Sequence, residues 1–182
     1  MPVISGLGER YPSAYNQAEQ LAIPNLCMSV RTLQGSLDAA QLRIGVVVSR
    51  FNEFITEQLA KGAVEKLQQR GCTEITVSKV PGAWELAIAA RALAPVCDAI
   101  VALGAVVRGD TPHFEYVCQG ATEGLNRVSL DLGIPIAFGV LTTDSLQQAM
   151  DRAGGVSGNK GSEAADAAIE MANLLRQCKE LK

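Results

Sequence analysis

The sequence has few of the residue types on which several large classes of protein depend. Of its 182 residues only 4% are aromatic, one is a histidine and five are cysteines. The cysteines lie far apart and form no C-x-x-C pair, so neither a disulfide framework nor a zinc site is indicated. A single histidine also leaves few ligands for other metals. We expect a protein without a metal in a reducing cytoplasm.

Clustered basic residues and long apolar runs are missing as well. The chain has 16 Lys and Arg against 19 Asp and Glu, and its net charge is −3. Nucleic acid is therefore not expected as a partner, because binding to the phosphate backbone needs clustered Lys and Arg. The longest apolar runs, residues 44–48 and 99–107, are far shorter than a membrane span. Composition favours one soluble domain.

The first 32 residues show no sustained helical or strand period. Scattered Pro, Gly, Ser and Asn are typical of an extension that is disordered or becomes ordered on contact. A basic start followed by an apolar core is missing, so we do not expect a signal peptide, and Glu9 and Glu19 do not suit a transit peptide. Met28 is an alternative translational start. We predict an irregular extension at 1–32 and one domain at 33–182.

From residue 42 onward, strand and helix patterns alternate regularly. Apolar spacing predicts strands at 42–49, 74–80, 98–105 and 134–141, and helices at 54–70, 82–96, 113–132, 145–152 and 162–179. Such alternation is typical of a parallel sheet with helices on both faces and right-handed crossovers. The predicted fold is α/β, a flavodoxin-like three-layer sandwich with a four-stranded parallel sheet.

The carboxyl ends of the predicted strands are the candidate site, because ligands bind there in open α/β sheets. The segments assigned to this rim are rich in glycine, polar and aromatic residues: 49–52, 80–85, 104–113 and the end of the fourth strand around Phe138. No G-x-G-x-x-G or Walker A pattern follows a strand, so dinucleotide and nucleoside triphosphate sites lack support.

Residues 104–114 join the third strand to the next helix and contain the only histidine. Thr111 is expected to be the N-cap and Pro112 the first helical residue, so free N–H groups would attract an anion. His113 would then be an acid–base group beside that anion. A lone histidine at a helix start is also often a mere surface residue. A Cys118–His113 nucleophile is poorly supported, because Cys118 would point to another side of the helix.

Six motifs occur in order over residues 33–177. They are Arg50-Phe51-Asn52, Pro81-Gly82-Ala83-Trp84-Glu85, residues 104–109 with Thr111 and His113, residues 138–143, Arg152-Ala153-Gly154 and Gly158-Asn159-Lys160-Gly161. Together they resemble the 6,7-dimethyl-8-ribityllumazine synthase family. The resemblance implies a transferase that condenses 5-amino-6-(D-ribitylamino)uracil with 3,4-dihydroxy-2-butanone 4-phosphate, the penultimate step of riboflavin biosynthesis. It also implies that no metal or organic cofactor takes part.

The resemblance assigns roles to individual residues. The pyrimidine and its ribityl chain are expected at Phe51, Ala83, Trp84, Glu85, Ala105, Val106, Val107 and Phe138. Aromatic and apolar side chains suit a flat pyrimidine, while Glu85 and nearby backbone groups suit the ribityl hydroxyls. Trp84 stands where the family often has phenylalanine, which keeps a ring contact but alters the shape of the pocket.

The phosphate is expected at the backbone of Asp110 and Thr111 and at the guanidinium of Arg152, with Lys160 as a weaker candidate. The carboxylate of Asp110 should turn away, because like charges repel. His113 would shuttle protons, although much of the acceleration should come from holding the two reactants together.

Each of these residues has a purely structural alternative. Phe51, Trp84 and Phe138 would also suit a core, Arg152 and Lys160 would suit solvated helix ends, and Glu85 would suit a helix dipole. Two other classes of function stay open: a flavin- or nucleotide-binding module without turnover, and a shell-forming protein with a silent site. Release of phosphate from the two substrates would separate the enzyme from both.

Assembly is the last expectation. A four-stranded parallel sheet has two edges with unpaired backbone groups, and residues 33–37 would suit strand addition to a neighbouring subunit. The resemblance implies a homopentamer with sites shared between adjacent subunits. In many family members twelve pentamers close into an icosahedral shell, and association with riboflavin synthase is a further implied partnership.

Overall fold

The computed structural model describes residues 29–181 of the 182-residue chain. Most of the expected extension, including Met28, lies outside these residues. Its boundary with the domain at residue 33 therefore stays a prediction.

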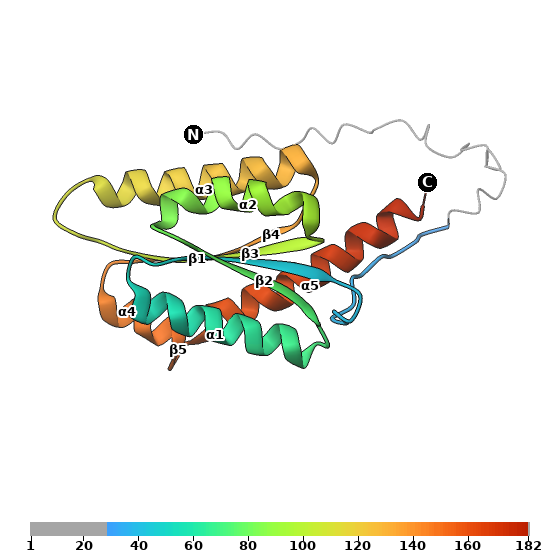
Figure 1. Cartoon of the computed structure of the whole chain (residues 1–182), viewed down its shortest axis with the longest axis horizontal. Coiled ribbons are helices and arrows are strands. Elements are labelled where there is room, and N and C mark those ends of the chain that lie inside the picture. Colours follow the sequence, from blue (N-terminus) through green and yellow to red (C-terminus); the bar gives the residue numbers. More distant parts are fainter. Residues whose placement is uncertain (1–28, 182) are drawn as a thin grey trace, which may run out of the picture. The chain divides into compact units, whose positions relative to one another are not determined.

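A four-stranded, all-parallel sheet forms the middle layer (Figure 1). Its strands are β1 (Arg43–Ser49), β2 (Glu74–Val80), β3 (Ala99–Val107) and β4 (Ile136–Thr143), in the spatial order β2-β1-β3-β4. This confirms the predicted three-layer α/β sandwich. β2 and β4 are the two edges, and within residues 29–181 no further strand pairs with either of them.

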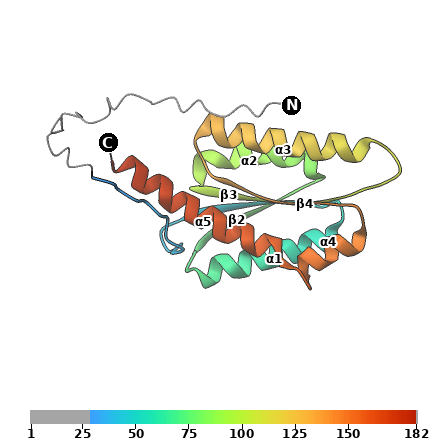
Figure 2. The same ribbon diagram turned by 180° about the vertical axis from the view of Figure 1, so that it is seen from behind.

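Helices cover both faces of the sheet. They are α1 (Glu53–Gln69), α2 (Leu86–Leu93), α3 (His113–Leu132), α4 (Leu146–Arg152) and α5 (Lys160–Lys179), with the short 3-10 turns η1 (Ala83–Glu85) and η2 (Ala94–Val96) around α2. Helices α2 and α3 lie on one face, and α1, α4 and α5 lie on the other (Figures 1 and 2). A small antiparallel hairpin, β5 (Ala153–Gly155) and β6 (Gly158–Asn159), was not predicted.

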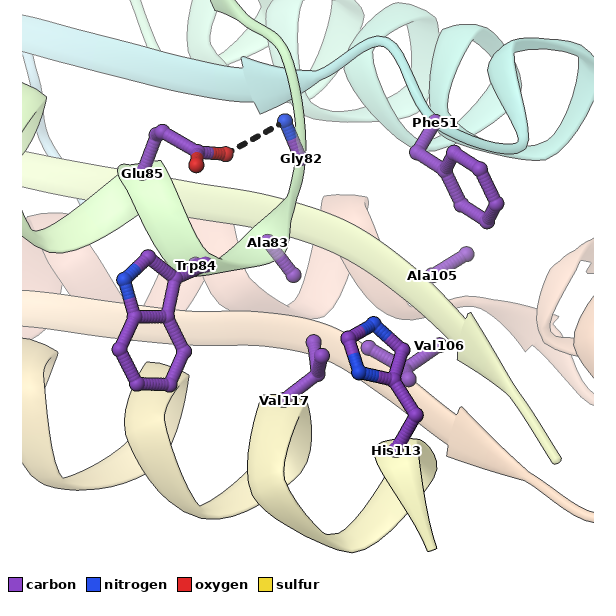
Figure 3. Close-up of a pocket in the computed structure, with 9 residues that line it drawn as sticks. All are labelled: Phe51, Gly82, Ala83, Trp84, Glu85, Ala105, Val106, His113 and Val117. Carbon is purple, nitrogen blue, oxygen red and sulfur yellow. Dashed lines mark hydrogen bonds between the residues drawn. The ribbon is translucent and has the colours of Figure 1, made fainter. Parts of the chain in front are cut away.

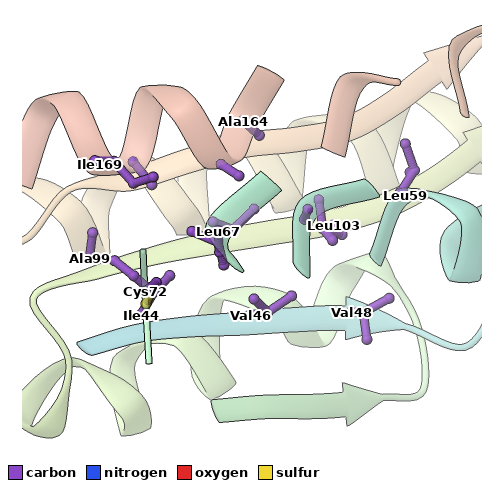
Figure 4. Close-up of a cluster of buried hydrophobic side chains, with 14 of the residues drawn as sticks. Ile44, Val46, Val48, Leu59, Leu67, Cys72, Ala99, Leu103, Ala164 and Ile169 are labelled. Atoms are coloured by element: carbon purple, nitrogen blue, oxygen red, sulfur yellow. The ribbon is translucent and has the colours of Figure 1, made fainter. Parts of the chain in front are cut away.

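The hydrophobic core consists of two clusters, one on each face of the sheet. Along β1, Val46 and Val48 point into the cluster beneath α1 and α5, while Val47 points into the cluster beneath α2 and α3. Figure 4 shows the first cluster, where Leu103 of β3 meets side chains of α1 and α5. Burial on both sides explains why the two central strands, β1 and β3, are continuous apolar runs.

The fourth strand lies two residues later than the pattern predicts. Ile134 lies just beyond α3 but is bonded to its last turn: its N–H donates to Ser129 O at 3.2 Å, and its carbonyl accepts from Ser129 Oγ at 2.7 Å. Gly133, with φ of 61°, provides the left-handed turn that this ending needs. The strand therefore begins only after Pro135.

Helix α3 also differs from the prediction at its start. Pro112, not Thr111, is the N-cap residue, and no side chain caps the helix. His113 is thus the first helical residue. At α5, by contrast, Asn159 Oδ1 accepts from the N–H groups of Gly161 at 2.9 Å and Ser162 at 3.2 Å, so that helix starts two residues earlier than expected.

No helix in residues 29–181 combines the length and the apolar character that crossing a membrane requires.

Candidate active site

A cavity of about 360 Å³ opens at the carboxyl ends of β1, β2 and β3, beside the start of α3 (Figure 3). Its lining consists of Phe51, Gly82, Ala83, Trp84, Glu85, Ala105, Val106, His113 and Val117. The predicted site residues that follow the first three strands are present here, except Val107, Asp110 and Thr111. Segments far apart in the sequence therefore converge at the expected rim.

Phe51 presents an exposed ring from a loop whose backbone is held by hydrogen bonds. Phe51 is 70% exposed, yet its backbone N–H donates to Pro81 O at 3.0 Å. The next residue, Asn52, has a φ of 59°, and its Nδ2 donates to Ala105 O at 2.9 Å. Asparagine tolerates this left-handed conformation better than most residues. The loop after β1 is thereby tied to both neighbouring strand ends.

The role of Asn52 was not predicted, although Asn52 lies in one of the motifs. An asparagine directly after a buried strand is a signal for a left-handed turn. The partner of its side chain, the carbonyl of Ala105, cannot be read from a sequence because it lies on a different strand.

The η1 turn presents its backbone and two side chains to the cavity. Glu85 Oε2 accepts the N–H of Gly82 at 2.8 Å, so this carboxylate caps the start of the turn. The structural alternative for Glu85, a stabilising role at the start of a helix, is thus partly correct. A carboxylate has several acceptor positions, so its other oxygen can still accept from a ligand hydroxyl. Trp84 is 59% exposed and extends from η1 toward α3 (Figure 3).

His113 is exposed and projects from the first position of α3 toward Val106 at the end of β3 (Figure 3). Val117, one turn further along the helix, lines the same cavity. Val107 does not. It packs against the cluster on the α1 and α5 face, because successive residues of a strand point to opposite faces. Its predicted contact with the pyrimidine therefore gains no support from this cavity and stays a prediction.

Arg108 braces the loop that leads into α3. Its Nε donates to Asp144 Oδ1 at 2.8 Å, it also pairs with Glu115, and its guanidinium carbon lies 4.1 Å from the centre of the Phe114 ring. The hydrogen bond from Arg108 lowers the pKa of the Glu115 carboxyl. These contacts connect the end of β4 to the first turn of α3, and so help to hold His113 in place.

Asp110 and Thr111 are exposed and are not among the residues that line this cavity. Their predicted contact with phosphate stays a prediction.

The remaining predicted residues lie in a second cavity, of about 520 Å³, along the edge strand β4. Phe138, Arg152 and Lys160 line it. Phe138 is the third residue of β4, so its expected position at the carboxyl end of the strand was wrong. The two cavities share no lining residue, and a single chain therefore does not bring these three side chains to His113.

The two cations of the second cavity are held differently. Arg152 Nη1 donates to Gln148 O at 3.0 Å, which leaves four other N–H groups of the guanidinium. Lys160 Nζ lies 2.8 Å and 2.7 Å from the two carboxylate oxygens of Glu163. Arg152 is therefore the side chain better able to bind a phosphate, and Lys160 stays the weaker candidate.

Thiol and metal chemistry gain no support from the described part of the chain. Burial raises the pKa of the Cys118 thiol, which disfavours the nucleophilic thiolate. Across residues 29–181, no three side chains of His, Cys, Asp or Glu are grouped so that they could hold a metal ion.

The comparison with known families agrees with this geometry. The family model described as 6,7-dimethyl-8-ribityllumazine synthase matches residues 41–176, which include every strand and all but the last residues of α5. The matched region contains both cavities. The chain therefore belongs to the 6,7-dimethyl-8-ribityllumazine synthase family, and so to the enzymes of lumazine formation in riboflavin biosynthesis.

Proposed function

We propose that the chain condenses 5-amino-6-(D-ribitylamino)uracil with 3,4-dihydroxy-2-butanone 4-phosphate to give 6,7-dimethyl-8-ribityllumazine and inorganic phosphate. The observation that carries this proposal is the cavity in which Phe51, the η1 turn and His113 meet. Membership of the family supports the same reaction.

The first cavity suits the ribitylaminouracil. An exposed aromatic ring at Phe51 faces apolar walls at Ala105 and Val106, which is the environment that a flat pyrimidine needs for stacking and edge contacts. Glu85 and the backbone of η1, which can bind hydroxyls, lie at the other end of the cavity. The ribityl chain would therefore run toward η1.

The second cavity suits the phosphorylated ketone, and we place it in a neighbouring subunit. Arg152 and Lys160 supply positive charge, and Arg152 offers planar, bidentate donors for a phosphate. Because this cavity lies on the edge strand β4, a head-to-tail ring would allow it to face the His113 cavity of the next copy. The homopentamer is the ring that we propose, with Phe138 completing the pyrimidine slot from the neighbouring subunit.

The chemistry follows from this placement. The 5-amino group attacks the ketone carbonyl, and loss of water leaves an imine. Enolisation then allows phosphate to leave, and attack of the ribityl-bearing nitrogen on the remaining carbonyl closes the ring with loss of a second water. His113 exchanges protons with the reacting atoms, while the two cavities hold the reactants together.

The test is to mix both substrates with the protein and to follow inorganic phosphate and the absorbance of the lumazine. We expect both products to appear in equal amounts. A protein that binds a flavin-like ligand tightly but releases no phosphate would be a binding module, and the proposal would be wrong.

A further inference from the structure

The indole of Trp84 occupies a place on α3 that only a glycine leaves open. A Cβ atom built on Gly120 would lie 2.1 Å from Cζ3, 2.5 Å from Cε3 and 2.9 Å from Cη2 of Trp84. Real Cβ atoms do not approach other heavy atoms below 3.0 Å. With any other residue at position 120, the indole would have to move.

The backbone gives no separate reason for a glycine at this position. Gly120 lies inside the helix His113–Leu132 and is absent from the glycines with positive φ. Glycine weakens the interior of a helix relative to alanine. The contact with Trp84 is therefore the feature of the structure that accounts for Gly120.

Gly120 continues the stripe of α3 that faces the cavity. His113, Val117 and Gly120 are spaced as i, i+4 and i+7, which places them along one side of a helix. The first two line the cavity with their own side chains. At the third position the benzene half of the Trp84 indole takes the space instead, and Figure 3 shows this ring reaching from η1 to α3.

We propose that Gly120 is a positioning residue, which seats Trp84 as the wall of the cavity at the end where the ribityl chain is expected. The identity of the ligand rests on the proposed function, whereas the placement of the ring does not. The three atoms that meet Gly120 all belong to the outer, benzene half of the indole. A phenylalanine side chain is shorter, so replacing Trp84 by phenylalanine should remove the need for glycine.

The chain offers a direct readout, because Trp84 is its only tryptophan. In the Gly120→Ala variant without ligand, we expect a shift of the tryptophan emission maximum and altered quenching by acrylamide. Equilibrium dialysis should show about 5- to 10-fold weaker binding of 6,7-dimethyl-8-ribityllumazine, as expected from a displaced aromatic contact. In a Trp84→Phe background, the same Gly120→Ala change should alter binding by less than about 2-fold.

Gly124→Ala is the matched control. It adds the same methyl group to the same helix one turn later, where its Cβ would lie 2.8 Å from the Cβ of Ala87 and would strain the packing of α3 on α2 without touching Trp84. Its emission maximum should shift much less than that of Gly120→Ala. If Gly124→Ala shifts the emission as much as Gly120→Ala does, a general displacement of α3 is the cause, and the proposal is overturned.

Other outcomes separate this proposal from the proposed function. Unchanged emission in Gly120→Ala, or an equal loss of lumazine binding in the Trp84→Phe background, would overturn the role of Gly120. A protein that binds no lumazine in any form, but shows the emission shift, would overturn the proposed function and support the positioning role. If Gly120→Ala does not fold, the variant that also carries Trp84→Phe should fold, and failure of both would contradict the proposal.

Discussion

At the scale of single residues, the side chain of His113 is accessible to a ligand, while neighbouring contacts hold the backbone that carries it. It is exposed at the first position of α3, and the contacts of Arg108 with Asp144 and Glu115 hold the segment before it. Replacing it should therefore disturb the chemistry and leave the fold intact.

We expect His113→Ala to lower kcat by about 10²-fold or less, because positioning of the two substrates would remain. Lumazine absorbance under saturating substrates gives kcat, and circular dichroism checks the fold. An unchanged kcat would remove His113 from the proton transfers.

Arg152 should matter for the phosphorylated substrate alone. We expect Arg152→Ala to raise the KM for the butanone phosphate by about 10- to 100-fold, because a charge-assisted pair to phosphate is lost. The affinity for pyrimidine analogues should stay the same. Lys160→Ala is the comparison, and its effect should be smaller because Glu163 already neutralises Lys160. Equal losses for both substrates would contradict this assignment.

At the scale of helices and strands, the close approach of α5 to α1 depends on Gly161. A Cβ atom at this position would lie 2.1 Å from the carbonyl oxygen of Leu59, which is backbone and cannot rotate away. We expect Gly161→Ala to lower the free energy of unfolding by about 1–3 kcal/mol through overpacking. Urea denaturation at fixed protein concentration measures this change.

Gly109→Ala is the control for Gly161→Ala, because a Cβ atom there would meet nothing within 4 Å. Its unfolding midpoint should stay close to that of the unchanged protein. Equal destabilisation by both substitutions would show that the packing of α5 on α1 is not the cause.

Asp98 ties the starts of β1 and β3 together in a pH-dependent way. It accepts the N–H of Arg43 at 2.8 Å and the Nε of Arg43 at 3.2 Å, and Arg176 lies 3.4 Å away. Partial burial acts to raise the pKa of Asp98, but the hydrogen bonds and charges of the two arginines outweigh it and lower the pKa. Its stabilisation is therefore present above the unfolded pKa and is lost as the pH falls through the folded pKa.

We expect Asp98→Asn to lower the free energy of unfolding by about 1 kcal/mol near pH 7. The difference should begin to shrink as the pH falls below about 4 and should disappear as the pH passes below the lowered pKa of Asp98, because the carboxyl group is then protonated. Urea denaturation across this pH range tests the prediction. A difference that is constant at all pH values would mean that the charge of Asp98 is not involved.

The sequence predicts the strands well where their apolar pattern is clear, and less well where the chain turns. β1 and β2 lie within one residue of their predicted bounds, β1 because the apolar run 44–48 is too short for a helix and β2 because its apolar residues alternate. The hairpin β5–β6 escaped prediction because it is too short to show a period. It is shaped by left-handed glycines, Gly154 and Gly158.

The same continuous apolar runs limit the prediction of the site. Val106 and Val107 are indistinguishable in sequence, yet a shift of one residue turns a side chain to the opposite face of the sheet. Phe138 shows a second limit, because a motif gives the strand but not the position along it. The predicted residues that do line the first cavity follow strand ends marked by glycine or a polar residue.

At the scale of the whole molecule, the outer sides of the edge strands β2 and β4 carry no further strand within residues 29–181. Residues 33–37 form no strand within the described chain. Their carbonyl groups are held on α5, where Gln177 Nε2 donates to Gln34 O at 2.9 Å and Asn173 Nδ2 donates to Ser36 O at 2.9 Å. Strand addition to a neighbouring sheet stays a prediction for this segment.

We expect light scattering to show a pentamer or a multiple of it, and electron microscopy to show whether twelve pentamers form a shell. The intact chain should be compared with a version that starts at Met28. A monomer in both cases would contradict the assembly. A shell in the shorter version alone would identify the first 27 residues as the obstacle, and only such a shell could enclose riboflavin synthase.

The separation of the two cavities has a consequence for mixtures of damaged subunits. Suppose that each catalytic centre takes His113 from one copy and Arg152 from the next. A subunit with His113→Ala then still contributes an intact Arg152 cavity, and a subunit with Arg152→Ala still contributes an intact His113 cavity. When these two impaired proteins are unfolded together and reassembled, about a quarter of the interfaces should join an intact His113 cavity to an intact Arg152 cavity. Activity should then rise well above that of either parent, whereas a site contained within one chain would show no such complementation.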